Sequence, residues 1–133
     1  GRSETESVIS TVVEEPGDAF GLTRLRFGDR ILKVLHIQAA KGEPVRVRIP
    51  ARQVAIALSP PGRTSFQNVF PGEIREICDH GDPFVDVRLD IGRSLWARIT
   101  RQSLSELNLK PGQPVFALIK SVAVASGPSD ACR

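Results

Sequence analysis

Gly17-Asp18-Ala19-Phe20, followed by Arg24-Leu25-Arg26-Phe27-Gly28, is the first of two copies of one pattern in this chain. The second copy begins 64 residues later, as Gly81-Asp82-Pro83-Phe84 and then Arg88-Leu89-Asp90-Ile91-Gly92. Repetition at a fixed offset indicates one structural unit that is used twice. The chain is therefore expected to fold as two similar halves.

A later match locates a difference between the halves. Lys41-Gly42-Glu43-Pro44-Val45 corresponds to Pro111-Gly112-Gln113-Pro114-Val115 at an offset of 70 instead of 64, so the second half holds about six more residues. They fall where the sequence has its one helical periodicity, in residues 103–109. Ser103 and Glu106 there have capping-box spacing, and Pro111-Gly112 ends the run. We predict one short helix, inserted in the second half.

Alternation of apolar and polar residues predicts half-buried β-strands in much of the remaining chain. The alternating runs lie at residues 22–27, 45–49, 54–58, 84–89 and 115–119, and Gly, Pro or Asp bounds each of them. Short strands with regular turns, in units of half of a 133-residue chain, favour an all-β fold of two OB-like small β-barrels. A β-sandwich is the alternative.

The stiff segment Ser59-Pro60-Pro61-Gly62-Arg63 separates the halves, because neither proline can donate to a β-ladder. We therefore expect a linker at 1–7, a first OB-like subdomain at 8–60, a second at 61–125 and a flexible tail at 126–133. Barrels this small bury little surface alone, so the halves are expected to share a core. The polar start and the absence of Met suggest a fragment of a larger protein.

Several functional classes are disfavoured by what the sequence lacks. No apolar run is long enough to span a bilayer. No phosphate-binding loop and no Cys or His cluster with metal-ligand spacing occurs, and neither His36 nor His80 lies near a plausible nucleophile in sequence. We expect no catalytic residue, no metal site and no enzyme in this chain. Cys78 and Cys132 suit a reducing compartment better than a disulfide.

Two segments gather small hydrogen-bond donors without any acidic residue, namely 65–72, which begins Ser65-Phe66-Gln67-Asn68, and Ile119-Lys120-Ser121-Val122. A tetrahedral dianion without protons accepts hydrogen bonds only, so hydroxyls, amides and one cation suit it. Thr100 adds a hydroxyl near a helix start. Spacing alone favours a simpler interpretation, in which Ser65 and Asn68 begin a turn and Lys120 is a solvated strand residue.

A family resemblance favours the oxyanion site over this simpler interpretation. The run Ser65 to Ile74, the stretch Leu95 to Ser103 and the end Leu118-Ile119-Lys120-Ser121-Val122 resemble a molybdopterin-binding-protein-like domain, known as a MOP or TOBE domain. The resemblance covers nearly all of residues 62–125. The first half is similar to the segment that precedes this module in the ATP-binding subunits of molybdate importers.

The resemblance implies a regulatory module of a molybdate importer that binds molybdate or tungstate and senses cytoplasmic oxyanion. Matched by position, Ser65, Thr100 and Ser121 would supply hydroxyls and Lys120 the charge, with the backbone N–H groups of Lys120 and Ser121 as further donors. Gln67 and Asn68 complete the expected oxyanion site. Gln67 replaces an arginine that the family commonly has, and Arg63, Arg98 and Arg101 are the candidates to compensate for it.

The family also implies a homodimer. It implies that a parent ATPase domain and membrane subunits are the partners, and that the parent protein lies in the cytoplasm at the inner face of the cell membrane. The first half has Pro50 and Ala51 where the second has Lys120 and Ser121, so we expect one class of site per chain. The main alternative is a TOBE domain of another importer that binds no oxyanion. A purely structural dimerisation module is another alternative. A nucleic-acid-binding OB module is permitted by the pI of 9.3, but a stacking platform for bases is missing, because the chain has one Trp, no Tyr and only six Phe spread along its length.

Overall fold

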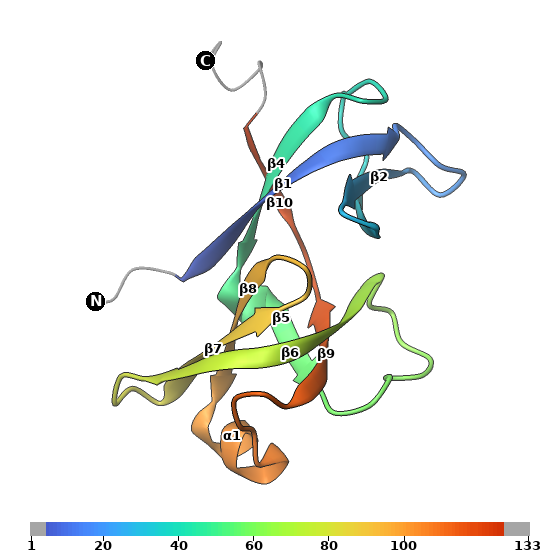
Figure 1. Cartoon of the computed structure of the whole chain (residues 1–133). Coiled ribbons are helices and arrows are strands. Elements are labelled where there is room, and N and C mark those ends of the chain that lie inside the picture. The colour runs from blue at the N-terminus through green and yellow to red at the C-terminus, as the bar shows by residue number, and fades with distance from the viewer. Residues whose placement is uncertain (1–4, 127–133) are drawn as a thin grey trace. The chain divides into compact units, whose positions relative to one another are not determined.

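The computed structural model describes residues 5–126. Within that range the structure has ten strands, a single 3-10 turn and one short helix (Figure 1). In chain order they are β1 (Glu6–Glu15), β2 (Leu22–Phe27), β3 (Arg30–Leu35), β4 (Pro44–Pro50), η1 (Ala51–Gln53), β5 (Val54–Ala57), β6 (Asn68–Asp79), β7 (Phe84–Asp90), β8 (Ser94–Thr100), α1 (Arg101–Leu107), β9 (Pro114–Ile119) and β10 (Ala123–Ser126). The fold is all-β with the helix in the second half, as predicted. That helix is too short to span a membrane.

The strands form two five-stranded antiparallel sheets, ordered β10-β4-β1-β2-β3 and β5-β9-β6-β7-β8. The five strands β1–β5 of the first half correspond in order to the five strands β6–β10 of the second half. Each half therefore contributes four strands to its own sheet and its fifth strand to the other sheet. In the second sheet the edge strands β5 and β8 contact each other, so the sheet curls as in an OB-like barrel. The β-sandwich alternative is therefore wrong.

This exchange moves the expected domain boundary. The chain forms two compact units: Ile49–Lys120 groups with 5–7, and Val8–Arg48 groups with the described residues from Ser121. The strand β5 lies before the proline-rich segment in sequence, yet it pairs with β9 and belongs to the first unit. A division at residue 60 would separate β5 from its partner. Most of the tail at 126–133, and Cys132, lie outside the described residues.

Residues 5–7, the described part of the linker expected at 1–7, are part of the fold. β1 begins at Glu6, and Ser7 is buried, with its hydroxyl oxygen accepting the Trp96 N–H at 2.8 Å. The Thr5 hydroxyl donates to Asp86 at 3.2 Å. Residues 5–7 are therefore part of the Ile49–Lys120 unit.

The core of this unit follows the alternation of its strands. Val85, Val87 and Leu89 of β7 are fully buried. Leu89 lies opposite the buried residues Ile74 of β6 and Leu95 of β8, and Val87 lies opposite the buried Ala97 of β8. Gly72 in β6 is required where that strand passes β7, because a Cβ atom there would lie 2.7 Å from the Asp90 carbonyl oxygen. Packing this close leaves no room for a larger residue at position 72.

The helix α1 is capped differently from the prediction. Thr100, not Ser103, is the N-cap residue, and its hydroxyl oxygen accepts the Ser103 N–H at 3.0 Å. Asn108 ends the helix in the left-handed conformation, with φ of 51°. The helix lies between β8 and β9, where the second half has its additional residues. None of its side chains is fully buried, so the cap and the contacts with β7 and β8 hold it in place.

Candidate functional site

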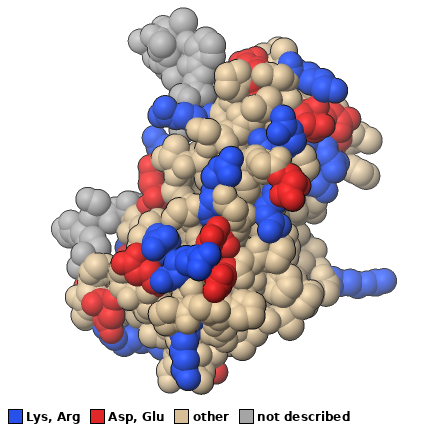
Figure 2. All heavy atoms as spheres, viewed as in Figure 1, with Lys and Arg blue, Asp and Glu red and all other residues tan. Residues whose placement is uncertain are grey.

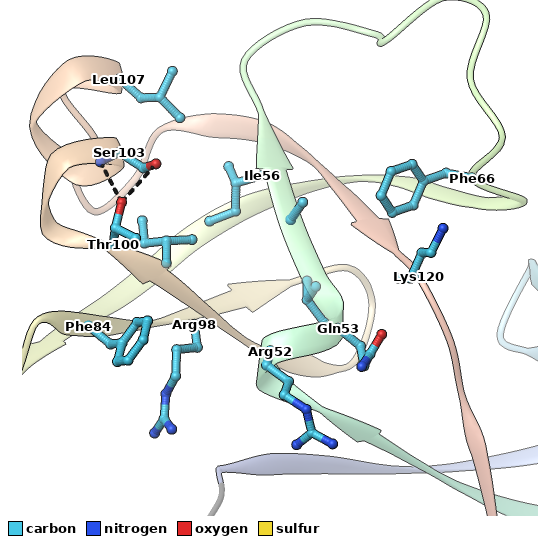
Figure 3. A pocket seen from close by; sticks show the side chains of 13 residues that line it. Arg52, Gln53, Ile56, Phe66, Phe84, Arg98, Thr100, Ser103, Leu107 and Lys120 are labelled. Atoms are coloured by element: carbon cyan, nitrogen blue, oxygen red, sulfur yellow. Dashed lines mark hydrogen bonds between the residues drawn. The ribbon is translucent and has the colours of Figure 1, made fainter.

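A cavity of about 410 Å³ opens in the Ile49–Lys120 unit, beside the edge strands β5 and β8 (Figure 3). Five consecutive residues of η1 and β5, 52–56, line it, and so do three of β8, 98–100. Ser103 and Leu107 of the helix lie at one end, and Phe66 and Lys120 lie at the other. The cavity therefore joins residues from both halves of the repeat.

Lys120 is placed by the end of β9, a strand with neighbours on both sides. Ile119 lies opposite Val54 of β5 and Asn68 of β6. The Lys120 backbone N–H donates to the Gln53 carbonyl at 2.7 Å. That N–H is already engaged, so the expectation that it serves as an oxyanion donor is wrong in this structure.

The Lys120 ammonium lies over the ring of Phe66, with Nζ 5.7 Å from the ring centroid. This distance is within the range of a cation–π contact. Figure 3 shows the side chain of Lys120 directed toward that ring at the rim of the cavity. The charge of Lys120 is thus held at a defined place although the side chain is exposed.

The cavity has a positive lining. Arg52, Arg98 and Lys120 contribute to it, and none of the described residues that line it is Asp or Glu. Its remaining wall is largely apolar, with Ile56, Ile99 and other hydrophobic side chains. An anion that enters this space meets cations and amides, and no carboxylate in the lining repels it.

Arg98 is committed to an ion pair behind the cavity wall. Its Nε and Nη2 atoms donate to the two carboxylate oxygens of Asp86 at 2.9 and 3.1 Å, and Nη2 also donates to the Thr5 hydroxyl at 3.1 Å. The Asp86 side chain is 5% exposed. The hydrogen bonds from Arg98 lower the pKa of Asp86 below its ordinary value, against the opposing effect of burial. This pair organises β7, β8 and the start of the chain.

Another candidate to compensate for Gln67 is also engaged. The Arg101 guanidinium binds both carboxylate oxygens of Asp79 at 2.6 Å and the Asp82 carbonyl at 2.9 Å. Those contacts tie the β6–β7 turn to the start of the helix. Arg101 is absent from the cavity lining, which contains Arg52 instead.

The structure brings only part of the predicted oxyanion site together. Lys120 and Thr100 both line the cavity, but the Thr100 hydroxyl also donates to Ser103 Oγ at 3.1 Å. Ser65 and Gln67 are exposed outside the lining, and Asn68 is buried at the start of β6. These three therefore flank Phe66 without facing the same space.

Ser121, the remaining predicted residue, groups with the other compact unit. Three residues that sequence reasoning missed, Arg52, Gln53 and Phe66, lie with Lys120 at the cavity. No local sequence pattern marks Arg52 and Gln53 as site residues, because only the exchange of β5 between the sheets brings the η1 turn to the end of β9.

Elsewhere on the surface, basic residues are mostly balanced by acidic ones. Figure 2 shows Lys and Arg interspersed with Asp and Glu on the face it draws. Ion pairs such as Arg26 with Glu14 at 3.1 Å and Arg88 with Glu76 at 3.0 Å account for this mixture. A nucleic-acid interface is typically a stripe of one sign, and this face does not have one.

Known proteins resemble this chain over most of its length. Residues 64–125 match the model of the TOBE domain. The molybdenum import ATP-binding protein ModC of Yersinia pseudotuberculosis is 44% identical over 123 residues, which are 92% of this chain and 34% of that protein. The ModC protein of Paramagnetospirillum magneticum is 41% identical over 128 residues, or 96% of this chain and 35% of the relative. The chain thus spans about a third of the length of these curated relatives.

A solved structure confirms the fold assignment. The cytoplasmic molybdate-binding protein ModG, in a crystal form with molybdate bound, superposes with a TM-score of 0.75 at 22% identity. The superposition covers 90% of this chain and 96% of that one. Residues 64–125 thus match the TOBE domain within a fold of two OB-like barrels, and nearly all of the chain is similar to a segment of the molybdenum import ATP-binding proteins.

Proposed function

We propose that this chain is the regulatory oxyanion-binding part of the ATP-binding subunit of a molybdate importer, with molybdate or tungstate as its ligand. The observation that carries the proposal is the cavity lining, to which Lys120, Arg52 and Gln53 contribute and in which none of the described residues is a carboxylate. The names of the ModC relatives and of the ModG structure supply the ligand.

The chemistry of the ligand fits that donor set. A tetrahedral dianion has only acceptor oxygens, and charge-assisted hydrogen bonds to it are stronger than neutral ones. Lys120 supplies the positive charge, and the amide of Gln67 with the hydroxyls of Ser65 and Ser121 supply neutral donors. Asn68 is buried at the start of β6 and is assigned no contact with the ion. Thr100 lies at the helix end of the cavity, hydrogen-bonded to Ser103, so we assign it no contact with an ion at Lys120.

A second copy of the chain belongs to this proposal. Ser65 and Gln67 are exposed, so donors that do not face the cavity of their own copy remain available to a neighbouring one. We therefore propose a homodimer in which residues of both copies surround each ion. Such a dimer would have two equivalent sites by symmetry.

The rest of the proposal concerns the longer protein. ATP hydrolysis, contacts with an ATPase domain and contacts with membrane subunits are assigned to the parent transporter, located at the cytoplasmic face of the membrane. The described part of this chain contributes no catalytic residue, resident metal or cofactor to that scheme. Its role is to sense the imported oxyanion after it has entered the cell.

Isothermal titration with molybdate, tungstate and sulfate tests the proposal. Molybdate and tungstate are expected to bind, and Lys120→Gln should remove most of that binding because it deletes the charge. Lys110→Gln is the matched control, since Lys110 is exposed in the same unit but outside the cavity lining. Absence of binding for all three ions would favour the alternative, an accessory TOBE domain without an oxyanion site.

A further inference from the structure

The ammonium of Lys120 has a partner that the family motif does not assign. Position 66 lies between Ser65 and Gln67, and its ring is 5.7 Å from Lys120 Nζ. The ring face carries negative electrostatic potential, so it attracts an ammonium without forming a hydrogen bond. The three N–H donors of the ammonium therefore stay available to an anion.

The backbone of the same lysine is held from the opposite half of the repeat. The Gln53 carbonyl accepts the Lys120 N–H at 2.7 Å, and Val54 pairs with Ile119 directly before it. Lys120 is thus fixed at its backbone by η1 and at its ammonium by Phe66. A long, flexible lysine side chain loses much rotamer freedom when it binds a ligand, and a lysine that is already restrained loses less.

We propose that Phe66 is a positioning residue for Lys120, and that the Phe66 ring with the Gln53 carbonyl compensates in part for the guanidinium missing at position 67. The inference rests on the proposed oxyanion function. Phe66 itself does not contact the ion in this proposal. Its effect on binding passes through the ammonium that it restrains.

Replacement of Phe66 separates an electrostatic role from simple packing. Phe66→Leu keeps an apolar side chain and is expected to weaken molybdate binding about two- to five-fold, which corresponds to a cation–π contact at an exposed site. Phe66→Trp should retain the wild-type affinity or exceed it, because indole is the strongest cation–π partner. Pentafluorophenylalanine, introduced only at position 66, keeps the shape of the ring but reverses its electrostatic potential. The protein that carries it should bind molybdate as weakly as the Phe66→Leu variant.

A measurement without ligand distinguishes this inference from the proposed function. In the wild-type chain the proton resonances of the Lys120 εCH₂ group should be shifted upfield by the ring, and Phe66→Leu should abolish that shift. An unshifted wild-type resonance would overturn the positioning role even if molybdate binds. Equal molybdate affinity of the phenylalanine and pentafluorophenylalanine proteins would overturn it as well. If the ring-current shift is present and no oxyanion binds, the contact stands and the proposed function fails, so the compensating role fails with it.

Discussion

The ion pair between the buried Asp86 carboxylate and Arg98 is expected to stabilise the Ile49–Lys120 unit. Asp86→Asn removes the negative charge that faces the Arg98 guanidinium and keeps the size of the side chain. Breaking a buried pair by removing one partner costs about 3–5 kcal/mol. The Arg98 side chain is 19% exposed and can gain some hydration, and asparagine keeps one acceptor oxygen. We therefore expect a loss of about 2–3 kcal/mol in the free energy of unfolding.

Urea denaturation followed by fluorescence measures this loss, because Trp96 is the one tryptophan of the sequence and lies in β8 two residues before Arg98. The midpoint should fall by on the order of 1–2 M urea. Asp79→Asn is the matched control, since Asp79 forms a similar two-point pair with Arg101, but both side chains are nearly half exposed, at 48% and 44%. Its effect should be clearly smaller because solvent screens the pair. Equal midpoint shifts in the two variants would refute the argument from burial.

The same pair predicts a pH dependence with a definite sign. The pKa of Asp86 is lower in the folded chain than its ordinary value, chiefly because Arg98 donates hydrogen bonds to the carboxylate. Such a group adds stability above its unfolded pKa of about 3.9, and that stability is lost as the pH falls through the folded pKa. The difference in stability between wild type and Asp86→Asn should therefore be full at pH 7 and shrink below about pH 4. A difference that stays constant down to pH 3 would contradict this cause.

Further predictions concern the cap, the close strand contact and position 67. Thr100→Ala should cost about 1 kcal/mol and speed amide exchange in α1, whereas Thr100→Ser should preserve both; equal exchange in the two variants would contradict the capping role. Gly72→Ala should lower the urea midpoint strongly because its Cβ atom would lie 2.7 Å from the Asp90 carbonyl oxygen, while Gly17→Ala should be tolerated with its nearest contact at 3.5 Å. Gln67→Arg should raise molybdate affinity on the order of tenfold in calorimetry by restoring a charge-assisted hydrogen bond, and an unchanged affinity would place residue 67 outside the site.

The strands and the helix were predicted from local patterns, which are clear in the sequence. Alternation in residues 84–89 placed β7, and the longer offset in the second half placed α1. β1 was missed because its inward positions include Ser7 and Thr11, whose hydroxyls bond to other strands, so a buried face looked polar. An alternation rule counts such residues as exposed.

The candidate site was harder to predict, because it depends on which sheet the fifth strand joins. Repeat matching treats each half as self-contained, and nothing local distinguishes a strand that pairs within its half from one that crosses over. The crossing of β5 brings Arg52 and Gln53 to Lys120. Lys120 itself could be named from the motif, whereas its contact with Phe66 follows only from the fold of the loop before β6.

The proposed oxyanion site lies at the end of the cavity marked by Lys120. A crystal of the chain grown with tungstate tests it most directly, because the anomalous scattering of tungsten locates the ion independently of any assumption about the ligand. We expect a tungsten peak with its oxygens about 3 Å from Lys120 Nζ, and no such peak in Lys120→Gln. Tungsten bound only at sites remote from Lys120, or absent at saturating tungstate, would rule out an oxyanion site at Lys120.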